Sequence, residues 1–94
     1  MLELKVVEPG TVHLTGRLDA AEADRAMAVF EPLPGPLTAD CEGLEYISSA
    51  GLSVLVVTHK RLMASGHKLR IVNLQPRVRN VFKYAGLDRL FQVE

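Results

Sequence analysis

The sequence contains few of the residues on which several classes of protein depend. A single cysteine, Cys41, excludes an intrachain disulfide framework and fits a reducing, cytoplasmic environment. Tryptophan is absent and aromatic residues make up only 5% of the chain, so platforms for stacking nucleic-acid bases are missing. No apolar run is long enough to span a bilayer, and the N-terminus lacks the apolar stretch of a signal peptide. We therefore expect one cytoplasmic domain over residues 1–94, without direct nucleic-acid binding or membrane insertion.

Net charge is also lacking, because 11 basic residues balance 11 acidic ones. The charges are nevertheless unevenly distributed along the chain. Residues 1–47 carry 3 basic and 9 acidic side chains, whereas residues 48–94 carry 8 basic and 2 acidic ones. Since the two halves of so small a domain must pack together, this asymmetry indicates opposed charged faces that could orient a partner. Scattered, solvated charge without consequence is the alternative interpretation.

Five stretches have the alternation or the β-branched content that is typical of strands. The first two flank Pro9-Gly10 and predict an antiparallel hairpin. The third is expected to be a short, buried strand. In chain order, the five stretches are residues 2–7, 11–16, 37–41, 68–73 and 90–93.

Three helices are predicted between the later strands. Asp19 and Glu22 have the spacing of a capping box and predict a first helix over about 20–31. The second helix ends at Gly66, and Pro76 opens the third, which Gly86 ends. The residues expected to face inward are Ala23, Ala26, Met27 and Phe30 in the first helix, Leu52, Leu55, Val56, His59, Leu62 and Met63 in the second, and Val78, Val81, Phe82 and Ala85 in the third.

The resulting order is β-β-α-β-α-β-α-β, which assigns the chain to the α/β class. Alternation of strands and helices after the first hairpin favours a mixed, mostly parallel sheet of four to five strands covered by about three helices. No internal repeat or linker divides the chain, so a single domain is expected.

The motifs of common enzymes and metal sites are missing. Neither glycine-rich phosphate-binding motif is present, and the three histidines and one cysteine do not have the spacing of metal ligands. We expect no cofactor and no metal. Ser49 and Gly51 partly resemble a nucleophile elbow, but Ile47 stands where that motif requires glycine. The chain is therefore predicted not to be an enzyme.

Two serines, Ser48 and Ser49, lie at the predicted junction between the third strand and the second helix. Either could cap the helix, whose first N–H groups are unsatisfied and partially positive. A phosphoryl group added there would interact favourably with these donors and with the helix dipole, and would leave the fold intact. This position therefore suits a binary switch, although a simple capping role would also explain a serine pair.

The segment Leu-Glu-Tyr-Ile-Ser-Ser-Ala-Gly-Leu over residues 44–52 resembles the signature of STAS domains, and in particular of bacterial anti-sigma-factor antagonists. Residues 14–19, 69–76 and 86–91 also resemble that family, in the same order along the chain. The resemblance implies a STAS-like fold. It also implies a partner that is both anti-sigma factor and serine protein kinase. In the family, the unmodified antagonist binds this partner and releases the sigma factor, and phosphorylation of one serine prevents binding.

Alignment with the family places the phosphorylated serine at Ser49, with Ser48 as the alternative acceptor because it replaces the usual aspartate. The resemblance implies partner binding at the start of the second helix and its outer flank. Val54 and Val57 fall off the predicted core stripe, and either form an exposed apolar strip or tuck under a neighbouring helix. Asp19 matches a family aspartate near the partner surface, although capping alone would explain it. The predicted partner-binding residues are Asp19, Ser48, Ser49, Ala50, Gly51, Ser53, Val54 and Val57.

A second role is compatible with the same resemblance. Small STAS subunits also serve as accessory proteins of bacterial lipid-transport ABC systems. The family often has serine or threonine where this chain has Ala50, and this departure and that at Ser48 are compatible with the accessory role. In either case, the sequence is consistent with a monomer or a weak dimer.

Overall fold

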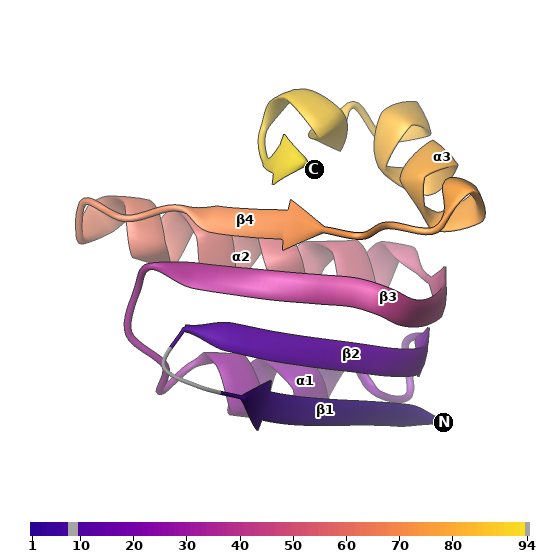
Figure 1. Ribbon diagram of the computed structural model, residues 1–94, viewed down its shortest axis with the longest axis horizontal. Coiled ribbons are helices and arrows are strands. Elements are labelled where there is room, and N and C mark those ends of the chain that lie inside the picture. Colours follow the sequence, from indigo (N-terminus) through magenta and orange to yellow (C-terminus); the bar gives the residue numbers. More distant parts are fainter. Residues whose placement is uncertain (8–9, 94) are drawn as a thin grey trace.

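Five strands form one mixed sheet in the order β1-β2-β3-β4-β5 (Figure 1). The computed structural model describes residues 1–7 and 10–93. β1 and β2 are antiparallel, as predicted, whereas β3, β4 and β5 continue the sheet parallel to β2. Pro9, in the expected hairpin turn, lies outside the described residues. The strands are β1 Leu2–Val7, β2 Thr11–Leu18, β3 Leu37–Ile47, β4 Leu69–Val72 and β5 Gln92–Val93.

Two helices, α1 (Ala23–Phe30) and α2 (Ser49–Ala64), lie side by side behind β1 to β4 in Figure 1. α3 (Pro76–Tyr84) and the short 3-10 helix η1 (Leu87–Arg89) lie beyond β4. In β2 and in the first half of β3, alternate residues are buried in the core and the residues between them are more exposed and polar. After Cys41 the buried residues of β3, Leu44 and Ile47, are three positions apart, where the pairing with β2 shifts its register. The predicted α/β class, the mixed sheet of four to five strands and the three main helices are therefore confirmed.

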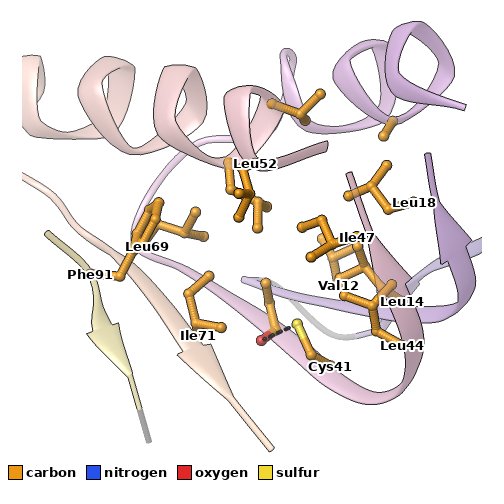
Figure 2. Packing of buried hydrophobic residues seen from close by; sticks show 14 of the residues in the cluster. Val12, Leu14, Leu18, Cys41, Leu44, Ile47, Leu52, Leu69, Ile71 and Phe91 are labelled. Carbon is orange, nitrogen blue, oxygen red and sulfur yellow. Dashed lines mark hydrogen bonds between the residues drawn. The ribbon is translucent and has the colours of Figure 1, made fainter. Parts of the chain in front are cut away.

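The core lies between the sheet and α1 and α2, as Figure 2 shows. Leu14, Leu44 and Leu55 are completely buried there. Cys41 is also buried, and its thiol donates a hydrogen bond to the carbonyl oxygen of Ala39 at 3.8 Å (Figure 2). Burial raises the pKa of the Cys41 thiol to about 12, so the cysteine behaves as an apolar core residue.

The first helix begins at Ala23, three residues later than the prediction. Residues 20–22 form a turn instead, in which the Glu22 N–H donates to Asp19 Oδ1 at 3.2 Å. The Glu22 carboxylate does not return to Asp19, as a capping box requires. It accepts hydrogen bonds from the N–H of Leu2 at 2.8 Å and from Arg25. The predicted start of the first helix was wrong, because the Glu22 carboxylate binds the backbone of β1 and does not cap the helix.

The third strand is longer than the predicted stretch over residues 37–41, since β3 extends for 11 residues to Ile47. Its second half remains in the sheet because Leu44 and Ile47 continue the buried face. Gly43 permits this pairing, because a Cβ at that position would lie 2.8 Å from Thr15 Oγ1. β3 therefore carries the chain directly to the start of α2.

The buried face of α2 is displaced from the predicted one. Val54 is 3% exposed and Thr58 is 1% exposed, whereas Met63, expected in the core, is 54% exposed. The periodicity of a single helix does not account for this difference. α2 packs against both the sheet and α1, and therefore buries a wider face. Ala85 of the third helix was also expected to face inward, but it caps the end of α3 and is exposed.

Candidate functional site

The carboxyl ends of β2 and β3 meet at one edge of the sheet, where α2 begins. The N–H of Ser48, directly after β3, donates to the carbonyl oxygen of Leu18, the last residue of β2, at 3.0 Å. This edge lies on the right of Figure 1. The hydrogen bond fixes the start of α2 against the end of β2, so the ends of β2 and β3 and the first turn of α2 lie next to one another.

Ser48 is the N-cap of α2. Its backbone is extended, with φ −95° and ψ 174°, and its Oγ accepts a hydrogen bond from the Gly51 N–H at 3.2 Å. Its carbonyl oxygen accepts the first helical hydrogen bond, from the Leu52 N–H at 2.9 Å. The side chain is half-buried. Ser48 therefore fulfils the capping role that the sequence left open between the two serines.

Ser49 is the first residue of α2, and it is exposed to solvent. Its carbonyl oxygen accepts a hydrogen bond from Ser53 Oγ at 3.1 Å. Because the first four N–H groups of a helix have no partner inside it, the amides of Ser49 and Ala50 are left without a helical acceptor at the positive end of the helix dipole. The two adjacent serines thus differ in their surroundings: one hydroxyl is engaged in the cap, and the next is accessible.

The outer side of α2 continues this accessible surface. Ser49, Ser53 and Val57 are all exposed, and they follow one another at intervals of four residues, which places them in a row on one helix face. Val57 is 51% exposed, so half of the predicted apolar strip is present. Val54 does not belong to it, because burial removes its side chain from the surface. Its predicted place in an exposed strip was wrong, and the alternative of a packed side chain is confirmed.

Gly51 is buried, and it shapes the site instead of forming its surface. A Cβ added there would lie 2.6 Å from the carbonyl oxygen of Leu18 and 2.8 Å from Cγ1 of Ile47. Only glycine allows the first turn of α2 to pass so close to the ends of both strands. Asp19 follows Leu18 at the same edge, where it is half-buried and holds the turn before α1.

One pair of residues at this edge was not among the predicted site residues. The guanidinium carbon of Arg17 lies 4.3 Å from the centre of the Tyr46 ring. The two residues are register partners on β2 and β3, and Tyr46 is 37% exposed. The alternation of apolar and polar residues along β2 could have predicted that Arg17 faces away from the core, because the next residue, Leu18, is apolar and would face the core. The pairing with Tyr46 depends on the register of parallel strands, which the sequence does not display.

The sequence comparisons agree with this architecture over nearly the whole chain. Residues 5–94 match the family model of the STAS domain. The chain belongs to the STAS domain family. Within the described residues, no group of three or more histidine, cysteine, aspartate or glutamate side chains could hold a metal ion. No helix in the described part of the chain is both long and apolar enough to cross a membrane.

Two relatives of this STAS domain are named as anti-sigma factor antagonists. One is the anti-sigma F factor antagonist of Lysinibacillus sphaericus, 30% identical over 91 residues, which cover 92% of this chain and 78% of the relative. The other is BtrV of Bordetella bronchiseptica, named as an anti-sigma factor antagonist and 41% identical over 54 residues. That match covers 57% of this chain but only 47% of BtrV, so it spans about half of the relative.

Solved structures share the fold at lower sequence identity. The anti-sigma factor antagonist SpoIIAA in its unphosphorylated form has a TM-score of 0.79 and 22% identity, over 100% of this chain and 88% of that one. An anti-sigma factor antagonist from Thermotoga maritima has a TM-score of 0.82 and 22% identity, over 98% of this chain and 84% of that one. A sulfate transporter family protein from Wolinella succinogenes also matches, with a TM-score of 0.77 and 18% identity over 95% and 80% of the two chains. The STAS fold is therefore common to proteins of different names.

Proposed function

We propose that this STAS domain is an anti-sigma factor antagonist. Its unmodified form binds an anti-sigma factor that is also a serine protein kinase, and phosphorylation of Ser49 blocks the binding. The observation that carries the proposal is the exposed Ser49 hydroxyl at the first position of α2. Two relatives named as anti-sigma factor antagonists support the choice of partner.

The contacts of the two serines favour Ser49 over Ser48 as the phosphorylated residue. The Ser48 hydroxyl caps α2 through Gly51 and is half-buried, so its modification would remove a cap and require the first turn to move. The Ser49 hydroxyl is accessible without any such change. A phosphate there would lie beside the amides at the positive helix end that have no helical acceptor, an arrangement that binds anions in many proteins.

Charge is the physical basis of the proposed switch. Converting a complex from almost fully bound to almost fully dissociated requires a difference of about 5.5 kcal/mol in binding free energy. The loss of one serine hydrogen bond supplies only about 1 kcal/mol. A phosphate adds roughly −1.5 to −2 charges. If it faces an acidic or poorly solvated part of the partner, the cost reaches several kcal/mol.

The test uses the chain with the anti-sigma factor recovered alongside it from its native cells. Incubation with this partner and ATP is expected to add one phosphate, which peptide mass spectrometry should locate on Ser49. Ser49→Ala should bind whether or not ATP is present, and Ser49→Asp should bind much more weakly. Ser65→Asp is the matched control, because Ser65 is an exposed serine at the opposite end of α2. It should bind like the unmodified protein.

Three results would contradict the proposal. Phosphate located on Ser48 would refute the choice of acceptor, and equal affinities of Ser49→Ala and Ser49→Asp would refute the switch. Recovery of the permease and ATPase of a lipid-transport ABC system, with no anti-sigma factor, would refute the function and favour the accessory role. In the proposed role, the domain works in the cytoplasm by binding and not by catalysis, as a monomer or a weak dimer.

A further inference from the structure

The Arg17–Tyr46 pair faces away from the core. The residues that follow each of them, Leu18 and Ile47, are 0% and 2% exposed and point toward the helices. Because successive side chains of a strand point to opposite faces, Arg17 and Tyr46 lie on the face of the sheet that is turned away from α1 and α2. Arg17 is exposed and Tyr46 is 37% exposed, so the core does not account for this pairing.

The guanidinium of Arg17 retains unused hydrogen-bonding capacity. It lies over the Tyr46 ring at 4.3 Å, an interaction that orients the group but uses none of its N–H donors. Among the described residues, the ion pairs join His13 to Asp40 and Arg25 to Glu22, and none involves Arg17. A planar guanidinium presents its donors in a fixed fork that matches the two oxygens of a carboxylate. The Tyr46 ring therefore orients the Arg17 guanidinium, whose N–H donors remain available to bind a carboxylate.

The pair is also continuous with the start of α2. The carbonyl oxygen of Leu18, the residue after Arg17, accepts the hydrogen bond from Ser48 N–H at 3.0 Å. Tyr46 lies near the end of β3, two residues before Ser48. Arginine and tyrosine are among the residues that contribute most to binding energy at protein interfaces. Exposed Ser49 and the exposed Arg17–Tyr46 pair thus belong to the same edge of the molecule.

We propose that the Arg17–Tyr46 pair is a specificity-determining contact of the partner surface, and that it receives a carboxylate of the anti-sigma factor. This inference rests on the proposed function, and it adds the chemistry of the partner's contacting residue. Tyr46 orients the guanidinium, Arg17 binds the carboxylate through its fork of donors, and Ser49 controls whether the edge can dock. An acidic residue on the partner is selected, and a basic one is repelled.

The first test measures the affinity of Arg17 variants for the anti-sigma factor recovered with the unmodified chain. Arg17→Glu should weaken binding at least about tenfold at low salt, because it places two acidic groups opposite each other. Arg17→Lys should recover only part of the loss, since it keeps the charge but not the planar fork. Arg79→Glu is the matched control, because it reverses an exposed arginine on α3, and its affinity should stay within about twofold.

The second test uses the two tyrosines of the chain as reporters. Fluorotyrosine incorporation gives two 19F resonances, from Tyr46 and from Tyr84, which is 87% exposed on α3. Tyr84→Phe assigns them. Addition of the anti-sigma factor should shift or broaden the Tyr46 resonance and leave that of Tyr84 unchanged. In Arg17→Ala, whose folding is checked by circular dichroism, the same change in the Tyr46 resonance should require a higher concentration of the anti-sigma factor.

The outcomes separate this inference from the proposed function. If Ser49→Asp weakens binding but Arg17→Glu leaves it within about twofold, the inference is wrong and the proposed function stands. If the Tyr46 resonance does not respond to a partner that binds, the inference is likewise wrong. If no anti-sigma factor binds the unmodified chain, the proposed function itself fails.

Discussion

Gly51 and Leu18 approach so closely that a Cβ on Gly51 would lie 2.6 Å from the Leu18 carbonyl oxygen. That oxygen also accepts the hydrogen bond from Ser48 N–H. The same atom therefore anchors the start of α2 and leaves no room for a side chain at position 51. The position of Ser49 relative to β2 therefore depends on a residue with no side chain.

The first prediction concerns this contact. Gly51→Ala should lower the free energy of unfolding by about 1–3 kcal/mol, because the added methyl group collides with a backbone carbonyl that cannot turn aside. Chemical denaturation measures the change. Gly66→Asn is a suitable control, because a Cβ at Gly66 meets no atom within 4 Å and asparagine tolerates its φ of +81°. If Gly51→Ala is as stable as this control, the packing argument is wrong.

The two serines should respond differently to alanine. Ser48→Ala removes the N-cap and should cost about 1 kcal/mol of stability, or about 4–8 °C in Tm for a domain of this size. Ser49→Ala removes no hydrogen bond of the side chain and should change Tm little. Thermal melts followed by circular dichroism test both variants. Equal losses in the two proteins would show that the cap is not specific to Ser48.

Negative charge at the two ends of α2 should have opposite effects on stability. Ser49→Asp places a carboxylate at the positive end of the helix and should leave the unfolding free energy unchanged or raise it by up to about 1 kcal/mol. Ser65→Asp places the same charge at the negative end, where Ser65 caps the helix, and should lower it by a few tenths of a kcal/mol, roughly. Urea unfolding at low salt measures both. A clear destabilisation by Ser49→Asp would contradict the view that this end accepts a phosphate without unfolding.

His59 predicts a dependence of stability on pH. Burial, together with nearby Lys68, lowers its pKa, although a hydrogen bond to the backbone of Leu90 opposes the shift. In the fold, His59 Nδ1 accepts a hydrogen bond from the Leu69 N–H at 3.3 Å and stays neutral. The unfolded chain binds a proton there below pH 6.5, roughly, and the folded chain does so only at lower pH, so stability falls as pH decreases through this range.

His59→Gln separates this effect from the titration of other groups. Glutamine keeps an acceptor for Leu69 but carries no titrating ring. Unfolding free energies should be measured for both proteins between about pH 7 and pH 5, the range in which an ordinary histidine gains its charge. The unmodified protein should lose more stability on acidification than His59→Gln, and parallel curves would exclude His59 as the cause.

The sequence was informative where local chemistry determines the structure. The helical spacing of apolar residues that begins at Leu52, after the strand-like stretch over residues 37–41, placed Ser48 and Ser49 at a strand-to-helix junction. Proline at the start of α3 and glycine after its end were equally local signals. These features need no knowledge of the neighbouring elements, which explains their successful prediction.

The predictions failed where contacts with an element distant in the sequence determine the local structure. The start of α1 depends on Leu2 in β1, whose N–H donates a hydrogen bond to the Glu22 carboxylate. The burial of Val54 reflects the packing of α2 against α1 as well as the sheet, which the periodicity of one helix cannot reveal. The Arg17–Tyr46 contact follows from the register of two parallel strands, which is irregular just before Arg17.

The backbone N–H of Arg17 donates to the carbonyl oxygen of Met1 at 2.9 Å, so the first residue is held at the same edge as the start of α2. A purification tag or fluorescent fusion attached to Met1 would therefore emerge beside the surface that is proposed to dock. Such an extension would obstruct the anti-sigma factor without altering any side chain, and a loss of binding caused by the fusion would imitate phosphorylation.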